Sequence, residues 1–284
     1  MAQLPPLTRR GLLGLSGLAA VLSACGSGPE KTGPPTTKGR GRTKIVYGSD
    51  HPDQYGVLRV PDRKPLGLAV LVHGGFWLDQ YKAGLMDPMA DALHDLGYAT
   101  WNVEYRRVGT GGGFPATFDD IAAAFDKVAE LDLPEGLDVF SIGHSAGGHL
   151  AVWAASRTDS TPGGAPSVTP TTTISLSGVL DLTSAGHQGI GNGAPQGLMN
   201  GDPDQEAAAY ALGDPAALVP AKGRIVAVAA KDDDIVPPDQ SSTYVKLDSG
   251  AGGDGALVSV PGGHFDLIDP SSDAWAQIAQ LFPG

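Results

Sequence analysis

Short, continuously apolar segments, separated by longer stretches of helical spacing, constrain the fold of this chain more than any other feature. Residues 68–72 read Leu-Ala-Val-Leu-Val, and residues 224–230 read Arg-Ile-Val-Ala-Val-Ala-Ala. Such runs are typical of strands buried on both faces, as in a parallel sheet. Further strand-like segments lie at 98–103, 137–142, 172–176 and 256–260. Apolar residues recur at helical spacing between them: Phe118, Ile121, Ala122, Phe125, Val128 and Ala129. The sequence therefore predicts an α/β fold, with a doubly wound and mainly parallel sheet covered by helices on both faces.

A Gly-x-Ser-x-Gly sequence follows the predicted strand at 137–142 and precedes a run of small residues. It reads Gly143-His144-Ser145-Ala146-Gly147. Between a strand and a helix, this pattern is typical of a nucleophile elbow, in which a tight turn leaves room only for glycine on either side of the serine. We therefore expect Ser145 to project from a strand end, with a helix N-terminus behind it.

A serine hydroxyl is a weak nucleophile at neutral pH and needs a base, a group that orients the base, and donors for the oxyanion. Three carboxylates, Asp232, Asp233 and Asp234, follow the predicted strand at 224–230. One of them is suitably placed to orient a histidine. As an alternative, the three form a solvated turn that caps a helix starting near Pro238.

His264 is the best candidate for the base among the seven histidines. It follows the predicted strand at 256–260 on a Pro-Gly-Gly loop, and it comes after both the serine and the carboxylates in chain order. A lone histidine is more often structural than catalytic, and His187 is the second choice.

The loop after the predicted strand at 68–72 reads His73-Gly74-Gly75-Phe76-Trp77. Glycines on such a loop allow backbone N–H donors to approach a developing oxyanion, and Ala146 would donate from the helix start. The alternative is a glycine-rich turn that carries two aromatic residues into the core.

Together these segments resemble the α/β-hydrolase esterases, and most closely the branch of bifunctional feruloyl/acetyl-xylan esterases and kynurenine formamidase-like enzymes. The resemblance covers about residues 56–282 and rests on His-Gly-Gly-Phe-Trp, Glu104-Tyr105-Arg106, Gly-His-Ser-Ala-Gly-Gly-His-Leu, Asp-x-x-Val-Pro-Pro and Gly-His-Phe-Asp. It implies the α/β-hydrolase fold with a minimal cap, oxyanion donors at Gly75 and Phe76, and Asp233 as the acid, four positions before Pro237. Two features depart from hormone-sensitive-lipase-like enzymes: the loop is not His-Gly-Gly-Gly, and His144 replaces the acidic residue before their serine.

The resemblance implies a serine hydrolase (a carboxylic ester hydrolase) that forms an acyl-enzyme on Ser145 and acts on a small ester without a cofactor. Hydrolysis of an amide or formamide of the kynurenine formamidase type is the alternative within enzymes. A non-catalytic binding lipoprotein is the alternative of another class, because fold alone does not determine activity. The sequence has no Cys/His cluster with metal-ligand spacing.

The N-terminal residues 1–24 resemble a twin-arginine export signal, with Arg9-Arg10 before an uncharged apolar stretch that is short for a transmembrane helix. They end in Leu-Ser-Ala before Cys25, which resembles a bacterial lipobox; this is the only cysteine of the chain. We therefore expect lipidation at Cys25, a flexible tether over 25–44, a catalytic domain over 45–284, and export to the outer face of the bacterial cytoplasmic membrane or the cell envelope. The alternatives are an ordinary secretory signal and an uncleaved anchor.

Charge is distributed unevenly along the chain. Residues 26–44 have a net charge of +4, whereas residues 45–284 carry 12 basic and 30 acidic residues, a net charge of −18. Basic residues beside a lipid anchor would favour anionic headgroups. An acidic domain is a poor candidate for binding nucleic acid, whose phosphates require a basic patch. Solubility is the simpler explanation of the acidity.

Residues 184–215 occupy the place of a lid or cap but show no long amphipathic helix with an apolar face. The sequence therefore argues against a lipase lid and for a fairly open cleft.

Overall fold

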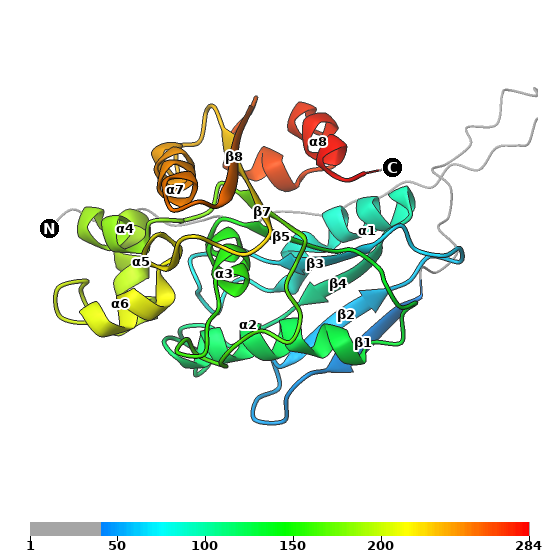
Figure 1. Cartoon of the computed structure of the whole chain (residues 1–284), viewed down its shortest axis with the longest axis horizontal. Coiled ribbons are helices and arrows are strands. Elements are labelled where there is room, and N and C mark those ends of the chain that lie inside the picture. Colours follow the sequence, from blue (N-terminus) through cyan, green and yellow to red (C-terminus); the bar gives the residue numbers. More distant parts are fainter. Residues whose placement is uncertain (1–40, 284) are drawn as a thin grey trace, which may run out of the picture. The chain divides into compact units, whose positions relative to one another are not determined.

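Eight strands form one sheet in the computed structural model, which describes residues 41–283 (Figure 1). The expectations for residues 1–24, Cys25 and most of the tether therefore lie outside the described residues. The strands are β1 (Arg42–Val46), β2 (Tyr55–Arg59), β3 (Leu68–Val72), β4 (Ala99–Val103), β5 (Val139–His144), β6 (Thr172–Leu176), β7 (Arg224–Ala230) and β8 (Asp254–Val260).

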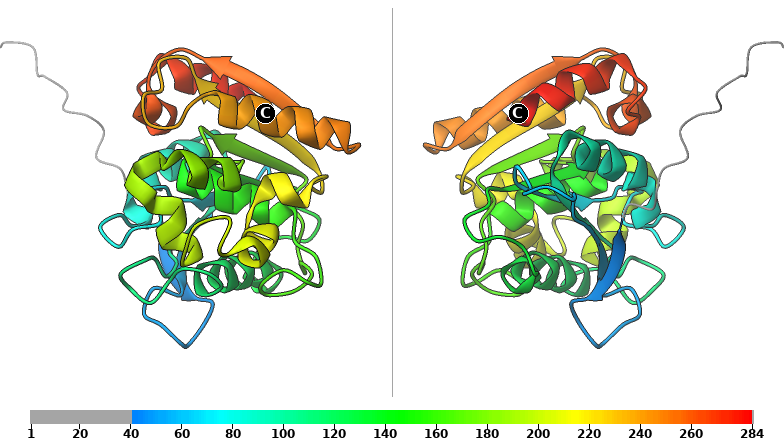
Figure 2. Two further views of the ribbon diagram at one scale, coloured as in Figure 1. Left: turned by 90° about the vertical axis from the view of Figure 1, so that its left-hand side faces the viewer. Right: turned by 90° about the vertical axis from the view of Figure 1, so that its right-hand side faces the viewer.

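The strand order is β1-β2-β4-β3-β5-β6-β7-β8. From β4 to β8 all neighbours pair in parallel, whereas β1 with β2 and β2 with β4 are antiparallel. Figure 2 shows β1 (blue) and β8 (orange) at opposite ends of the sheet. The predicted doubly wound, mainly parallel sheet is confirmed.

The α-helices are α1 (Asp87–Leu96), α2 (Ala116–Asp126), α3 (Ala146–Ala155), α4 (Leu182–Gln188), α5 (Ile190–Met199), α6 (Ala207–Gly213), α7 (Asp239–Gly250) and α8 (Asp273–Ile278). Short 3₁₀ helices lie at η1 (Ala83–Met86), η2 (Lys127–Glu130), η3 (Pro215–Leu218), η4 (His264–Ile268) and η5 (Ala279–Leu281). No helix within residues 41–283 is long and apolar enough to cross a membrane.

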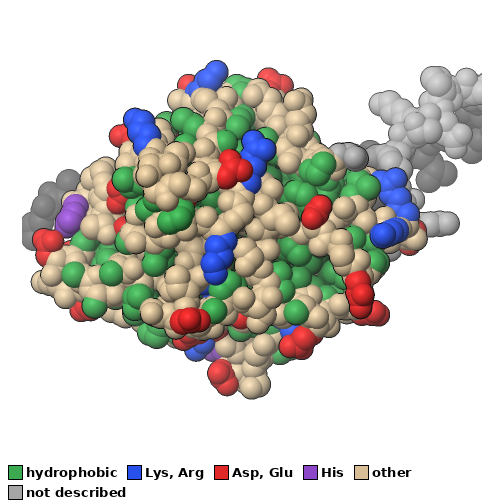
Figure 3. Space-filling model, in the orientation of Figure 1, with side chains coloured by type: hydrophobic (Ala, Val, Ile, Leu, Met, Phe, Trp, Pro, Cys, Tyr) green, Lys and Arg blue, Asp and Glu red, His purple; other side chains and the backbone are tan. Residues whose placement is uncertain are grey.

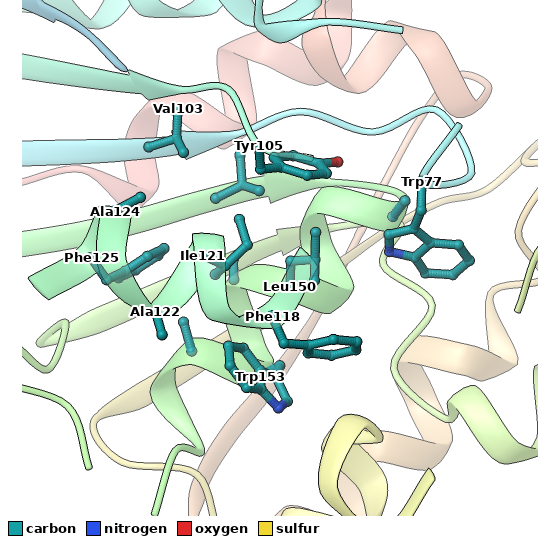
Figure 4. Packing of buried hydrophobic residues seen from close by; sticks show 14 of the residues in the cluster. Trp77, Val103, Tyr105, Phe118, Ile121, Ala122, Ala124, Phe125, Leu150 and Trp153 are labelled. Carbon is teal, nitrogen blue, oxygen red and sulfur yellow. The ribbon is translucent and has the colours of Figure 1, made fainter. Parts of the chain in front are cut away.

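Helices cover both faces of the sheet because side chains alternate along each strand. In β3, Val70 and Val72 pack on one face in a core cluster with residues of α2 and α3. Figure 4 shows part of this cluster, with Phe118 of α2 beside Trp153 of α3. The other face holds a second cluster, in which residues of β3, β5, β6 and β7 pack with α1 and α8: among them Ala69, Leu71, Met89, Leu93, Ile142, Ile174, Val226 and Ile278.

The predicted tether and the first strand overlap. β1 begins at Arg42, so its first three residues fall within the range assigned to the tether, 25–44. Their sequence is polar because β1 is an exposed edge strand that pairs only with β2, and Arg42 forms an ion pair with Asp91 of α1. Such a strand lacks the apolar pattern by which the buried strands were identified.

Three short helices, α4 to α6, lie between β6 and β7 in the chain, and we call this segment the cap. α6 is fastened to α3, since Trp153 Nε1 donates to the Leu212 carbonyl at 2.8 Å and His149 Nε2 to the Gly213 carbonyl at 2.8 Å. The start of α5 is not regular helix: Gly191, Asn192 and Gly193 all have left-handed backbone angles.

Candidate active site

Ser145 sits in the tight turn between β5 and α3. Its backbone angles, φ 55° and ψ −121°, are disfavoured for a side chain and are the strained geometry of a nucleophile elbow. A β-carbon on Gly143 would overlap the carbonyl of Gly147, and one on Gly147 would overlap the carbonyl of Val72. Both flanking glycines are therefore required by close backbone approach, and the predicted strand–turn–helix arrangement is present.

Asp233 and His264 follow the carboxyl ends of β7 and β8, which are parallel neighbours in the sheet. Their side chains meet: His264 Nδ1 lies 2.8 Å from Asp233 Oδ2, and both side chains are buried. Asp232 and Asp234 are exposed. Of the three adjacent carboxylates, the structure brings only Asp233 to His264.

The Asp233 carboxylate is held by several donors. Its Oδ1 accepts hydrogen bonds from the N–H groups of Ile235 at 3.0 Å and Val236 at 2.9 Å. Burial alone would raise the pKa of Asp233, but hydrogen bonds from His264, Ser177 and the Val236 amide lower this pKa to about 2. An ionised carboxylate only accepts, so His264 carries its proton on Nδ1 and presents Nε2 as the free base.

His144, directly before the serine, touches His264 from inside the protein. Its Nε2 donates to the His264 carbonyl at 3.0 Å, and the two ring centroids are 4.4 Å apart. Burial lowers the pKa of His144 to about 3, with the neighbouring His264 as a second cause, so the ring is neutral. The sequence assigned no role to His144, because its partner is a backbone carbonyl 120 residues away.

Ser145 and His264 share one small apolar cavity. It is lined by Gly75, Phe76, Tyr81, Leu85, His144, Ser145, Ile235, His264 and Phe265. Its free volume of about 20 Å³ admits about one water molecule. The expected fairly open cleft is thus narrow beside Ser145, where the aromatic side chains of Phe76, Tyr81 and Phe265, from separate loops, line the space. A larger hollow, lined by Asp138 and Arg224 among others, lies at the opposite edge of the sheet, near the strand starts.

The loop after β3 has an unusual backbone. Gly75, Phe76 and Trp77 all have positive φ angles, of 109°, 54° and 57°. Within residues 41–283, the N–H groups of Gly75, Phe76 and Ala146 donate to no carbonyl or side chain. Ala146 is buried and Gly75 and Phe76 are partly buried, so these free donors beside the serine are suited to an oxyanion.

A buried ionic network contacts the start of this loop through His73. His73 Nε2 lies 3.0 Å from Glu104 Oε1, and the other carboxylate oxygen accepts the Ala83 N–H at 3.0 Å. Arg107 pairs with Glu104 and also with Asp53, the latter at 2.7 Å. Burial opposes ionisation of Glu104, but its hydrogen bond with His73 and the other partners keep its pKa below the usual value. Only the family resemblance singles out Glu104-Tyr105-Arg106, and no pattern in the sequence predicts that Arg107 and Asp53 join this network.

His187, the second choice for the base, lies on α4 with a half-exposed side chain, 3.3 Å from Asp204. It does not line the cavity that holds Ser145. Among the residues that the structure describes, no group of three or more His, Cys, Asp or Glu side chains could hold a metal ion.

Known proteins share this architecture. The BD-FAE family model matches residues 58–247, more than half of the chain. Similar solved structures include a truncated carbohydrate esterase from gut microbiota, 20% identical, with 84% of this chain and 94% of that chain covered and a TM-score of 0.71. Esterase B from Lactobacillus rhamnosis is 18% identical over 84% of this chain and 82% of that chain, with a TM-score of 0.71.

A thermophilic esterase from the Planctomycetes species Thermogutta terrifontis is 19% identical over 85% of this chain and 90% of that chain, with a TM-score of 0.66. No curated protein is significantly similar in sequence. At these identities the solved structures establish the α/β-hydrolase fold, and the family model establishes the relationship. The chain therefore belongs to the BD-FAE family, built on the α/β-hydrolase fold.

Proposed function

We propose that the protein is a serine hydrolase of carboxylic esters that works through an acyl-enzyme intermediate. The observation that carries this proposal is the 2.8 Å hydrogen bond between His264 and Asp233 at a cavity that the strained Ser145 also lines. Each of the three groups follows the carboxyl end of a parallel strand, which is where ligands bind in sheets of this type.

In the proposed acylation step, Ser145 Oγ attacks the acyl carbon while His264 Nε2 takes the hydroxyl proton. The carbonyl oxygen becomes an oxyanion, which accepts from the N–H groups of Gly75, Phe76 and Ala146. When the ester C–O bond breaks, His264 returns the proton to the leaving alcohol, and the acyl group stays on Ser145. Asp233 remains ionised throughout, because its pKa is about 2, and stabilises the imidazolium.

Deacylation repeats these steps with water as the nucleophile. His264 takes a proton from the water, whose oxygen attacks the acyl-enzyme, and then returns that proton to Ser145 Oγ as the free acid forms. No step requires a redox change or any co-substrate other than water.

Two similar structures support an ester rather than another acyl substrate. One is of a carbohydrate esterase, and another is of esterase B inhibited by a tributyrin phosphonate. The small apolar cavity beside Ser145 suits an uncharged acyl group, since a charged group there would lose its hydration without an ionic partner.

The test is the hydrolysis of p-nitrophenyl acetate by the Ser145→Ala variant. We expect a loss on the order of 10⁴ to 10⁶ in kcat with an unchanged thermal midpoint, and no labelling by a fluorophosphonate probe. Ser249→Ala, at an exposed serine of α7, is the control and should keep full activity and labelling. If Ser145→Ala retains more than about a tenth of the activity, the proposed nucleophile is wrong.

A further inference from the structure

The positive φ angle of Phe76 has to be stabilised by contacts with other parts of the protein. A positive φ is disfavoured for a residue with a β-carbon, and Phe76 and Trp77 adopt it in succession. Trp77 is secured by its surroundings: its ring is buried against His149 with centroids 5.2 Å apart, and its carbonyl accepts from the Val108 N–H at 2.9 Å. Neither contact reaches the Phe76 side chain, which is only half-buried.

The Phe76 ring rests on the backbone of the cap at Gly191. A β-carbon placed on Gly191 would overlap Cε1 and Cδ1 of this ring, so the aromatic edge fits only against a bare α-carbon. One residue earlier in the loop, a β-carbon on Gly75 would overlap the ring of Tyr81. Tyr81, close to η1, thus packs against Gly75, and Gly191 of the cap packs against the Phe76 ring.

The cap segment 189–193 has the shape required for this contact. Gly189, Gly191, Asn192 and Gly193 have φ angles of 66°, 63°, 58° and 85°. These left-handed residues interrupt α5 and turn the chain so that the Gly191 α-carbon meets the Phe76 ring. A regular helix with ordinary side chains could not come so close.

We propose that Gly191 is a positioning residue for the oxyanion hole: by seating the Phe76 ring, the cap holds the Phe76 N–H in the direction that the oxyanion requires. The inference rests on the proposed ester hydrolysis and adds a role for the cap in catalysis. An N–H donor stabilises the oxyanion only where charge develops, in the transition state. A misdirected Phe76 amide should therefore lower kcat and leave KM almost unchanged.

The chain contains a matched control for this contact. Gly189 and Gly191 have nearly the same backbone angles, φ 66° and ψ 31° against φ 63° and ψ 32°. A β-carbon at Gly189 would meet no atom within 4 Å, whereas one at Gly191 would overlap Phe76. Alanine imposes the same backbone strain at both positions, and only Gly191→Ala disturbs the ring.

The experiment measures kcat, KM and the thermal midpoint of both variants with p-nitrophenyl acetate. We expect Gly191→Ala to lower kcat about 10- to 100-fold with KM within about twofold of wild type, since complete loss of one oxyanion donor costs about 10²- to 10³-fold. Gly189→Ala should stay within about twofold of wild-type kcat and share the stability loss that alanine causes at a position with positive φ. Equal kcat values for the two variants would overturn the proposal.

Phe76→Ala supplies a test that adds no atoms and so avoids a packing clash. It keeps the Phe76 N–H but removes the ring, and we expect kcat to fall as in Gly191→Ala. In the Phe76→Ala background, Gly191→Ala should have little further effect, because both changes break one contact. Wild-type kcat in Phe76→Ala, or full additivity of the two changes, would show that the cap does not act through the ring. Ser145→Ala activity above about a tenth of wild type would instead refute the proposed nucleophile, and with it the oxyanion site on which this inference rests.

Discussion

The candidate site depends on single groups whose hydrogen bonds leave them little freedom to rotate. Asp233 uses one carboxylate oxygen for two backbone N–H donors and the other for His264. His144 Nε2 donates to the backbone carbonyl of His264, and the centroids of the two rings are 4.4 Å apart. Because both Asp233 and His144 contact the imidazole, changes at these residues should affect turnover more than stability.

The first prediction concerns the three neighbouring aspartates. Asp233→Asn should lower kcat by about 10⁴, because an asparagine amide cannot stabilise the His264 imidazolium and can impose the wrong tautomer. Asp232→Asn and Asp234→Asn, at exposed positions, should stay close to wild type. Steady-state kinetics of the three variants decides the matter, and a dominant loss at either neighbour would contradict the assignment of Asp233.

The second prediction concerns stability in mild acid. Burial lowers the pKa of His149 to about 4, whereas imidazole in the unfolded chain titrates near 6.5. Between these values the unfolded state binds a proton that the folded state does not, so the free energy of unfolding falls as the pH falls. Each such histidine contributes a slope of about 1.4 kcal/mol per pH unit, and His144, with its pKa of about 3, adds a second.

His149→Gln isolates one of these contributions. Its amide N–H can replace Nε2–H as the donor to the Gly213 carbonyl, but it does not titrate. Urea unfolding at several pH values between 4.5 and 6 should show the slope reduced by about one proton. Above pH 7 the two proteins should have parallel pH dependence, and an unreduced slope in acid would mean that His149 is not the group responsible.

At the scale of elements, the elbow places α3 in direct contact with the strand backbone. Because a β-carbon on Gly147 would overlap the carbonyls of Val72 and His73, α3 approaches β3 as closely as its backbone permits. β3 in turn begins the loop that carries Gly75 and Phe76. The spacing between the serine and the free N–H donors is therefore determined by how closely a helix and a strand pack.

The third prediction tests this packing. Gly147→Ala should force α3 away from β3, lower the free energy of unfolding by about 1–3 kcal/mol or more, and reduce kcat. Gly197→Ala, in α5, is the control: a β-carbon there meets no atom within 4 Å, and alanine is favoured over glycine in a helix. Urea unfolding of both variants makes the comparison, and equal stabilities would show that α3 has room to move.

Most of the parallel strands could be predicted because burial on both faces makes them continuously apolar. The bounds of β3, β6 and β7 match the predicted segments. β1 could not be found, since an exposed edge strand carries no such pattern, and β8 was found only in part because its residues are half exposed. The left-handed start of α5 reads in the sequence only as a glycine-rich loop.

The candidate site was predictable where chain order carries information and not where contacts are made across the fold. Ser145, Asp233 and His264 follow from their order and from the strands they end. The contacts of Phe76 with Gly191, and of His144 with the His264 carbonyl, join residues more than 100 positions apart. Neither leaves a local signal, so the sequence alone does not predict the narrow, partly aromatic lining of the cavity beside Ser145.

At the scale of the whole molecule, the net charge of the domain affects which charged partners and surfaces it can approach. On the face shown in Figure 3, acidic and basic side chains are scattered and form no continuous basic patch. Together with the net charge of −18 over residues 45–284, this distribution gives a polyanion no attractive surface on that face. The acidic domain would also be repelled by anionic lipid headgroups, whereas the net charge of +4 over residues 26–44 would be attracted to them.

We propose that the enzyme is exported and held at a membrane by a lipid on Cys25, which lies outside the described residues. The support is the sequence alone: Arg9-Arg10, a short apolar stretch, and Leu-Ser-Ala directly before the only cysteine. A single acyl chain binds a membrane only weakly, but a diacylglyceryl group on the Cys25 sulfur would insert two chains and anchor the protein stably.

The last prediction follows from this proposal. Cys25→Ser removes the sulfur that would form the thioether, so the protein should remain unprocessed or be released into the soluble fraction. Hydrolysis of p-nitrophenyl acetate by the purified variant should equal that of wild type, because Cys25 precedes the α/β-hydrolase domain in the chain. Membrane fractionation of cells that express either form, with the migration of each on a gel, is the measurement. A fully soluble wild type, or a serine variant that partitions and migrates like wild type, would exclude the lipid anchor and leave only a general export signal.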